Sequence, residues 1–266
     1  MAEQMAGFVP ERETLVINAF VDLSDSLIDD YDPLDFLYRL LDHSLPLTRA
    51  VAGAVLLHYE GSLHLVASSD EKAEAVGILT VETKEGPAYE AFELGEPVTV
   101  ANRDDLAARW PRFAAHASSN DWSAAFATPL RLRDRILGAL VVFWTDEEVE
   151  HPTPQDQKEL SAFANVTSIA ILQQRETSDV RTVNLHLHKA LESRIKVEQA
   201  KGIIAATNSV PMGEAFDALR RYARFHGVRV ADVCRGLIAG ELHVSVLNDV
   251  VAKMPQRPAQ RHTKAE

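Results

Sequence analysis

Apolar residues recur along this chain with two different periods, which change near residues 50 and 155. Residues 13–41 have apolar positions at helical spacing, and Asp32-Pro33 is a typical start for the second of two helices. Apolar or alternating runs then indicate strands at 50–57, 63–68, 97–100, 122–132 and 136–144. Short helical patterns lie between the strands, at 71–79, 86–92 and 104–117. This order predicts an α+β domain with an antiparallel sheet.

A helical period returns at Gln155 and continues to Lys201 without a glycine or proline. We therefore expect one long helix over 155–200. After a polar patch at 173–179 the apolar positions alternate by three and four, as in a coiled-coil seam. This pattern favours a parallel homodimer with a seam of Leu172, Val180, Val183, Leu187 and Ala190. The alternative is a single helix that packs on its own domain.

Two shorter amphipathic patterns follow the long helix, at 212–224 and 230–238. Gly202 lies inside the preceding helical pattern, where a glycine costs about 1 kcal/mol relative to alanine. Either another helix packs closely on it, or the backbone of a ligand approaches it. In the second case Ala200 and Gly202 would leave a shallow surface beside the charge of Lys201.

Charge is distributed unevenly over the 266 residues, whose formal net charge is −12. Residues 181–266 hold 14 Lys and Arg and 8 Asp and Glu, a net charge of +6. Residues 1–180 therefore hold the other 13 Lys and Arg and 31 Asp and Glu, a net charge of −18. Such asymmetry indicates a module facing nucleic acid, attached to an acidic one. We expect loose tails at 1–12 and 244–266, the second basic and disordered.

Three features of the sequence bear on the cellular compartment of the protein. No apolar run approaches the roughly 20 residues of a membrane span. The segment Met1-Ala2-Glu3-Gln4 does not resemble the start of a secretory signal. Cys234 is the one cysteine, which fits a reducing compartment, and we expect it to fill a helix core. The sequence therefore predicts a cytoplasmic protein without a membrane partner.

Three motifs in register then carry a specific resemblance: E-Q-A-K-G-I-I at 198–204, E-A-F-D-A-L-R-R-Y-A-R at 214–224, and D-V at 232–233. Over about 190–242 the chain resembles the ANTAR family of RNA-binding antitermination regulators. The resemblance implies a three-helix bundle continuing from a coiled coil, here 181–243, that binds paired RNA stem-loops competing with a terminator. Pro211 replaces the usual Ser or Thr cap of the second helix, so Ser209 is the candidate cap.

The first part of the chain carries a second, weaker resemblance. With Ala127-Thr128-Pro129-Leu130 leading into 136–140, residues 13–175 resemble a GAF domain. This resemblance implies a sensory pocket for a small-molecule ligand, or a dimerisation scaffold. No cysteine precedes Cys234 for a bilin, no N-K-x-F-D-E signature is present, and the histidines are scattered. We therefore expect no cofactor and no metal.

A function follows from the two resemblances and from the basic residues. No phosphate loop, metal-ligand spacing or nucleophile elbow is visible, so we expect no enzyme and no catalytic residues. We expect an RNA-binding antitermination regulator under sensory control, and the alternative is a dimer that acts through protein contacts. The candidate RNA-binding residues lie on two helices and are Arg194, Lys196, Gln199, Ala200, Lys201, Gly202, Arg220, Arg221 and Arg224.

Overall fold

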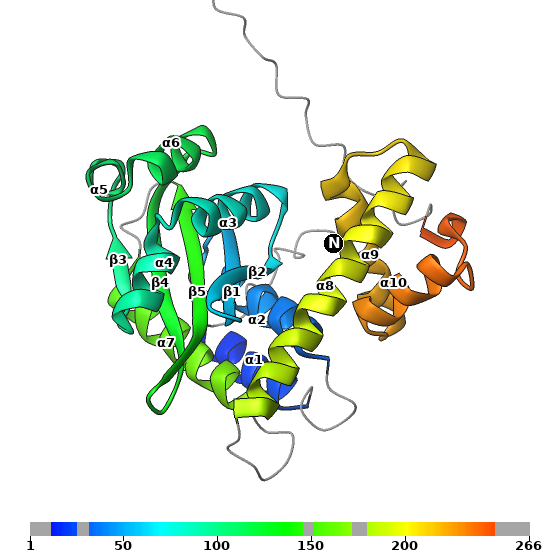
Figure 1. Ribbon diagram of the computed structural model, residues 1–266, viewed down its shortest axis with the longest axis horizontal. Coiled ribbons are helices and arrows are strands. Elements are labelled where there is room, and N and C mark those ends of the chain that lie inside the picture. Colours follow the sequence, from blue (N-terminus) through cyan, green and yellow to red (C-terminus); the bar gives the residue numbers. More distant parts are fainter. Residues whose placement is uncertain (1–11, 26–31, 146–151, 172–179, 248–266) are drawn as a thin grey trace, which may run out of the picture. The chain divides into compact units, whose positions relative to one another are not determined.

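The computed structural model describes residues 12–25, 32–145, 152–171 and 180–247 (Figure 1). The side chains of residues 180–184 are not described. The chain divides into two compact units, residues 1–195 and residues 196–266.

The first unit is built on a five-stranded antiparallel sheet, as the sequence predicted. The strands lie in the order β2-β1-β5-β4-β3, with bounds β1 Ala52–Tyr59, β2 Ser62–Ser68, β3 Val98–Val100, β4 Trp122–Leu132 and β5 Arg135–Thr145. At Gly138 of β5, a Cβ atom would collide with the carbonyl oxygen of Leu56 on β1. The glycine therefore allows the two central strands to pair in this register.

Four helices pack on one face of the sheet: α3 Glu71–Thr83, α4 Pro87–Leu94, α5 Arg103–Arg109 and α6 Pro111–Ser119. The sequence indicated one helical connection over 104–117, but the structure has two helices there. Trp110 is extended at φ −140°, and Pro111 begins α6, because proline suits the first helical position. Beneath these helices the Trp122 and Phe143 rings stack with centroids 4.2 Å apart.

The opposite face is covered by α2, Pro33–Thr48, and α7, Pro154–Ala170, while α1, Arg12–Asp25, packs on α2. Asp32 caps α2 by accepting a hydrogen bond from the Leu34 N–H at 2.8 Å, and Pro33 follows at the first helical position. The Trp144 indole N–H donates to the Thr48 carbonyl at 3.0 Å, which ties the end of α2 to β5.

The long helix predicted over 155–200 is described as two helices. α7 ends at Ala170 with Ile171 in a turn, α8 covers Val180–Asn208, and residues 172–179 lie outside the described part.

The structure describes only part of the expected dimer seam, and that part is buried in the single chain. Leu172 and the side chains of Val180 and Val183 lie outside the described residues. Leu187 and Ala190 are 2% and 0% exposed in the single chain, so they have no surface left to offer a second copy. At these two positions α8 packs on its own chain, which was the alternative interpretation of the pattern.

The second unit is helical, as expected, and contains the end of α8, α9 at Met212–His226, α10 at Val230–Ala239 and a short 3-10 helix, η1, at Val244–Leu247. Its buried side chains include Ile204, Leu219 and Leu237, and Cys234 fills the core as predicted. The expected disordered tail over 244–266 is wrong at its start, because Val244 and Leu247 are buried apolar residues of η1. Residues 248–266 lie outside the described part.

The turn between α8 and α9 also differs from expectation. Ser209 does not cap α9; Pro211 occupies the N-cap position and no side chain caps the helix. Ser209 instead follows α8 with a left-handed φ of +55°, and the Val210 N–H donates to the Ala205 carbonyl at 3.3 Å. This bond has the pattern of a Schellman motif, which ends α8.

Candidate nucleic-acid interface

The nine candidate RNA-binding residues fall into different environments. Arg194 belongs to the first unit, where its guanidinium donates to a Glu74 carboxylate oxygen on α3 at 2.9 Å and to the Val66 carbonyl on β2 at 3.2 Å. Its side chain is 13% exposed. Arg194 is therefore engaged in the fold of the first unit.

Lys201, which was expected beside a shallow open surface, is buried. The residue is 4% exposed, and its ammonium lies 2.8 Å from a Glu198 carboxylate oxygen and 5.4 Å from the centre of the Phe216 ring. A buried ammonium needs such partners, because desolvation otherwise disfavours the charge. Because the residue is buried, its aliphatic stem is removed from water together with its charge.

Ala200 and Gly202 do not share one open surface. Ala200 is fully buried in the bundle core. Gly202 is half-buried, and a Cβ atom placed on it would meet nothing within 4 Å. Among the described residues no helix packs closely on Gly202, which contradicts the close-packing explanation for this glycine. Space beside its backbone is open to a ligand.

The Phe216 ring joins the two helices that carry the candidates. Phe216 is 5% exposed. The Lys201 ammonium of α8 lies 5.4 Å from the centre of its ring, and the Arg220 guanidinium of α9 lies 5.5 Å from it. Cations over an aromatic face are attracted by the ring quadrupole. The structure thus brings Lys201 and Arg220 to one ring, with Arg220 half-buried.

Four candidates remain on the surface. Lys196 and Gln199 are exposed on α8, and Arg221 and Arg224 are exposed on α9. Exposed guanidinium groups can hold phosphate oxygens with two hydrogen bonds, whereas a lysine acts as a point charge. These side chains are the part of the predicted set that a large polyanion can reach.

Sequence reasoning missed the carboxylates that neutralise two candidates. Glu198 precedes Lys201 by three positions, a spacing that brings helical side chains together, and this signal was present in the sequence. Glu74 lies far from Arg194 along the chain and carried no such signal. A further group was missed on α10, where Asp232 accepts from Arg229 and Arg235, each at 2.6 Å. Burial would raise the pKa of Asp232, but the two arginines outweigh it and the pKa lies below its usual range.

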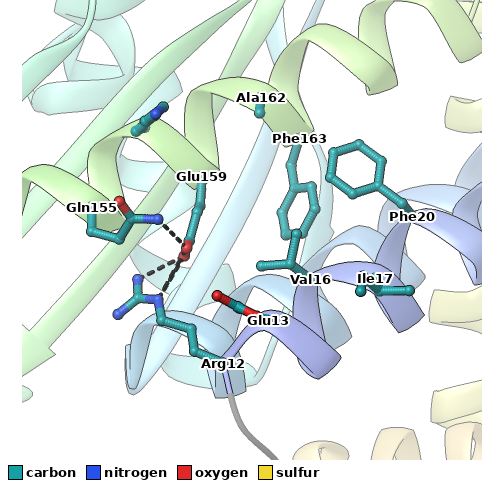
Figure 2. Close-up of a pocket in the computed structure, with 10 residues that line it drawn as sticks. Arg12, Glu13, Val16, Ile17, Phe20, Gln155, Glu159, Ala162 and Phe163 are labelled. Carbon is teal, nitrogen blue, oxygen red and sulfur yellow. Dashed lines mark hydrogen bonds and ion pairs between the residues drawn. The ribbon is translucent and has the colours of Figure 1, made fainter.

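The first unit has a groove of about 620 Å³ between α1 and α7 (Figure 2). At one end Arg12 forms ion pairs with Asp156 and Glu159, each at 2.6 Å, and the Glu159 hydrogen bond raises the pKa of Arg12 despite partial burial. At the other end the Phe20 and Phe163 rings meet edge to face, with centroids 5.4 Å apart. The groove is thus apolar at its centre and charged at one end.

Across residues 12–25, 32–145, 152–171 and 180–247, no group of three or more His, Cys, Asp and Glu side chains could hold a metal ion. Over the same residues, no helix combines the length and the apolar character needed to cross a bilayer.

Comparisons with known proteins match both units. The sequence model of the GAF domain family matches residues 31–172, and that of the ANTAR domain family matches residues 185–238. Similar solved structures include two GAF domains from phosphoenolpyruvate-protein phosphotransferases. The one from Coxiella burnetii has 14% identity and a TM-score of 0.47 over 61% of this chain and 95% of that chain. The one from Acinetobacter has 15% identity and a TM-score of 0.44 over 61% and 97%.

A third similar structure is the GAF domain of A. aeolicus nlh2 in an inactive state, with 13% identity and a TM-score of 0.47 over 62% of this chain and 99% of that chain. No curated protein matches the chain.

Proposed function

Because the chain belongs to the GAF domain family and carries an ANTAR domain after it, we propose that it is an RNA-binding antitermination regulator controlled by its sensory domain. Its ligand is a pair of adjacent stem-loops in a nascent transcript. Binding would favour these stem-loops over a competing terminator. The GAF domain would respond to a small-molecule ligand.

The observation that carries this proposal is the set of exposed basic residues on the ANTAR bundle. Lys196 on α8 and Arg221 and Arg224 on α9 are exposed, and Gly202 leaves open space beside its backbone. Phosphates and 2′-hydroxyls of a folded RNA are bound by such cations and by close backbone approach. The acidic net charge lies in the other part of the chain, at −18 for residues 1–180.

The first test measures binding of the full chain to a synthetic RNA with two adjacent hairpins, at several salt concentrations. Arg221→Ala should weaken binding and lower the slope of log affinity against log salt by roughly 0.7 to 0.9, the value for one lost phosphate contact. Arg112→Ala is the matched control, since its side chain is 71% exposed on α6 of the first unit. Salt-independent or absent RNA binding would support the alternative, a signalling dimer that acts through protein contacts.

Arg194 gives a second comparison within the same assay. Its guanidinium is already held by Glu74 and the Val66 carbonyl, so it has less capacity for phosphate than an exposed arginine. Arg194→Ala should therefore change the salt slope less than Arg221→Ala does. An equal change would mean that the Glu74 pair opens when RNA binds.

Homodimerisation is part of the proposal, but through a surface other than the predicted seam. Three apolar side chains are exposed on the two helices that form the groove: Ile17 at 61% and Val21 at 55% on α1, and Ile169 at 46% on α7. Glu13 and Lys158 line the same groove with opposite charges, which a two-fold axis could pair. This surface is open to a second copy, whereas Leu187 and Ala190 are buried.

Light scattering tests this surface. Ile17→Asp should convert the dimer to a monomer, because a carboxylate would be buried without a partner. Leu94→Asp is the control, because Leu94 is 62% exposed on α4, away from the groove. A dimer that survives Ile17→Asp would exclude the groove as the interface.

A further inference from the structure

Phe225 is exposed to an unusual degree. Its exposed fraction is 84%, against 36–62% for the other exposed large apolar side chains of the described residues. Single exposed apolar residues are common on protein surfaces and need no explanation by themselves. Phe225, however, lies beside other aromatic rings and beside arginines.

Three aromatic rings gather in the last two turns of α9. The Tyr222 and His226 rings have centroids 4.2 Å apart, and the Phe225 and His226 rings meet edge to face at 5.1 Å. Gly227 then ends the helix with a left-handed φ of +62°, and the Val228 N–H donates to the Ala223 carbonyl at 3.0 Å. This Schellman motif fixes the last turn, so the rings have a defined support.

The segment that carries these rings has basic residues and no acidic one. Residues 220–226 read R-R-Y-A-R-F-H, with three arginines and no carboxylate. Arg221 lies one helical turn before Phe225 and therefore on the same face of α9, and both are exposed. An aromatic face next to an arginine matches the two parts of an unpaired nucleotide, because the base stacks and the phosphate pairs with the guanidinium.

We propose that Phe225, supported by His226 and Tyr222, is a stacking platform for an unpaired base in the loop of the bound RNA, with Arg221 on the adjoining phosphate. This inference rests on the proposed RNA-binding function and adds to it the element that contacts the loop. A protein partner is the competing interpretation, and the oligomeric state measured below tests it. Stacking is tolerant of sequence, so the platform contributes affinity for an unpaired loop more than a choice of base.

The test uses the full chain and a pool of two-hairpin RNAs with randomised loops, enriched on the wild-type protein. Phe225→Ala should weaken binding of the enriched RNA by about 5- to 100-fold, the range for loss of one stacked base. The salt slope should not change, because no ion is removed. Phe225→Tyr should keep near wild-type affinity, and Ile238→Ala, which removes a 40% exposed side chain from α10, should have no effect.

A Phe225→Trp variant reports stacking directly. The natural tryptophans Trp110, Trp122 and Trp144 are buried in the first unit, so the added indole is an exposed reporter in the second. Its fluorescence should be quenched by the enriched RNA and not by a loop-free duplex of the same length. Quenching should also be lost when the loop nucleotides are replaced by abasic sites.

The possible failures are distinguishable. If the wild-type protein binds no hairpin RNA, the proposed function fails and the platform with it. If the wild type binds and Phe225→Ala binds equally well, only the platform is wrong. If Phe225→Ala changes the oligomeric state in light scattering, Phe225 lies in a protein interface and the proposal is overturned.

Discussion

At the scale of single residues, two neighbours in the A-K-G motif have opposite roles. Lys201 is buried between Glu198 and the Phe216 ring, while Gly202 opens onto free space. A substitution of Lys201 therefore tests the fold before it tests RNA binding.

Lys201→Ala should destabilise the helical bundle by about 1–2 kcal/mol, because it removes a cation–π contact, an ion pair and buried stem methylenes. Hydrogen exchange of the α8 and α9 amides measures this loss without interference from the first unit. Lys196→Ala, on an exposed position of the same helix, should leave exchange unchanged. Equal protection in both variants would contradict a structural role for Lys201.

Gly202→Ala should raise stability by about 1 kcal/mol, because alanine has the higher helix propensity and nothing clashes with its Cβ. Gly138→Ala provides the contrast, since the added methyl would collide with the Leu56 carbonyl and separate β1 from β5. Thermal unfolding should therefore move in opposite directions for the two variants. A destabilised Gly202→Ala protein would mean that a neighbour packs on this glycine after all.

At the scale of elements, the turn between α8 and α9 depends on Ser209 in a left-handed conformation, φ +55°. Glycine adopts this conformation without the steric cost of a Cβ. Ser209→Gly should therefore stabilise the bundle by up to about 1 kcal/mol. Ala206→Gly in the last turn of α8 should have the opposite sign, because there the backbone is helical. Hydrogen exchange at α8 would separate the two effects.

At the scale of the whole molecule, α8 is the one described helix that belongs to both units. Its first part is fixed to the sensory domain, where Ser193 donates to Asp32 at 3.0 Å and Arg194 pairs with Glu74. The continuing helix carries Lys201 into the bundle. α8 therefore connects the GAF domain to the ANTAR bundle through one continuous helix.

The first unit should also respond to pH through His186, which is 3% exposed. Burial lowers its pKa, and nearby Lys189 lowers it further, against a hydrogen bond with the Ile171 backbone that raises it. A folded pKa below the unfolded value, about 6.5, means that stability is present above that pH and is lost as the pH falls. The unfolding temperature of the first unit, followed by tryptophan fluorescence, should therefore fall from pH 7.5 to pH 5.5.

His186→Gln should make that pH dependence shallower, while His116→Asn should not, because His116 is exposed. Identical pH profiles for the wild type and His186→Gln would remove His186 as the cause.

The sequence by itself determined the elements and the two families. Period-two and helical spacing predicted the five strands and the helices between them, and Asp32-Pro33 marked the start of α2. These features are local, because they depend on neighbours within a turn or a strand. For the same reason the A-K-G motif and the arginines of α9 could be recognised without any structure.

Only the tertiary structure decided which of the basic residues are accessible. Arg194 is held by Glu74 and Lys201 lies against Phe216, and both partners are distant in the sequence, while Arg221 remains exposed. Leu187 and Ala190 likewise fit a dimer seam by spacing but pack on their own chain. Spacing along a helix shows which side chains share a face, but what covers that face is set by residues distant in sequence.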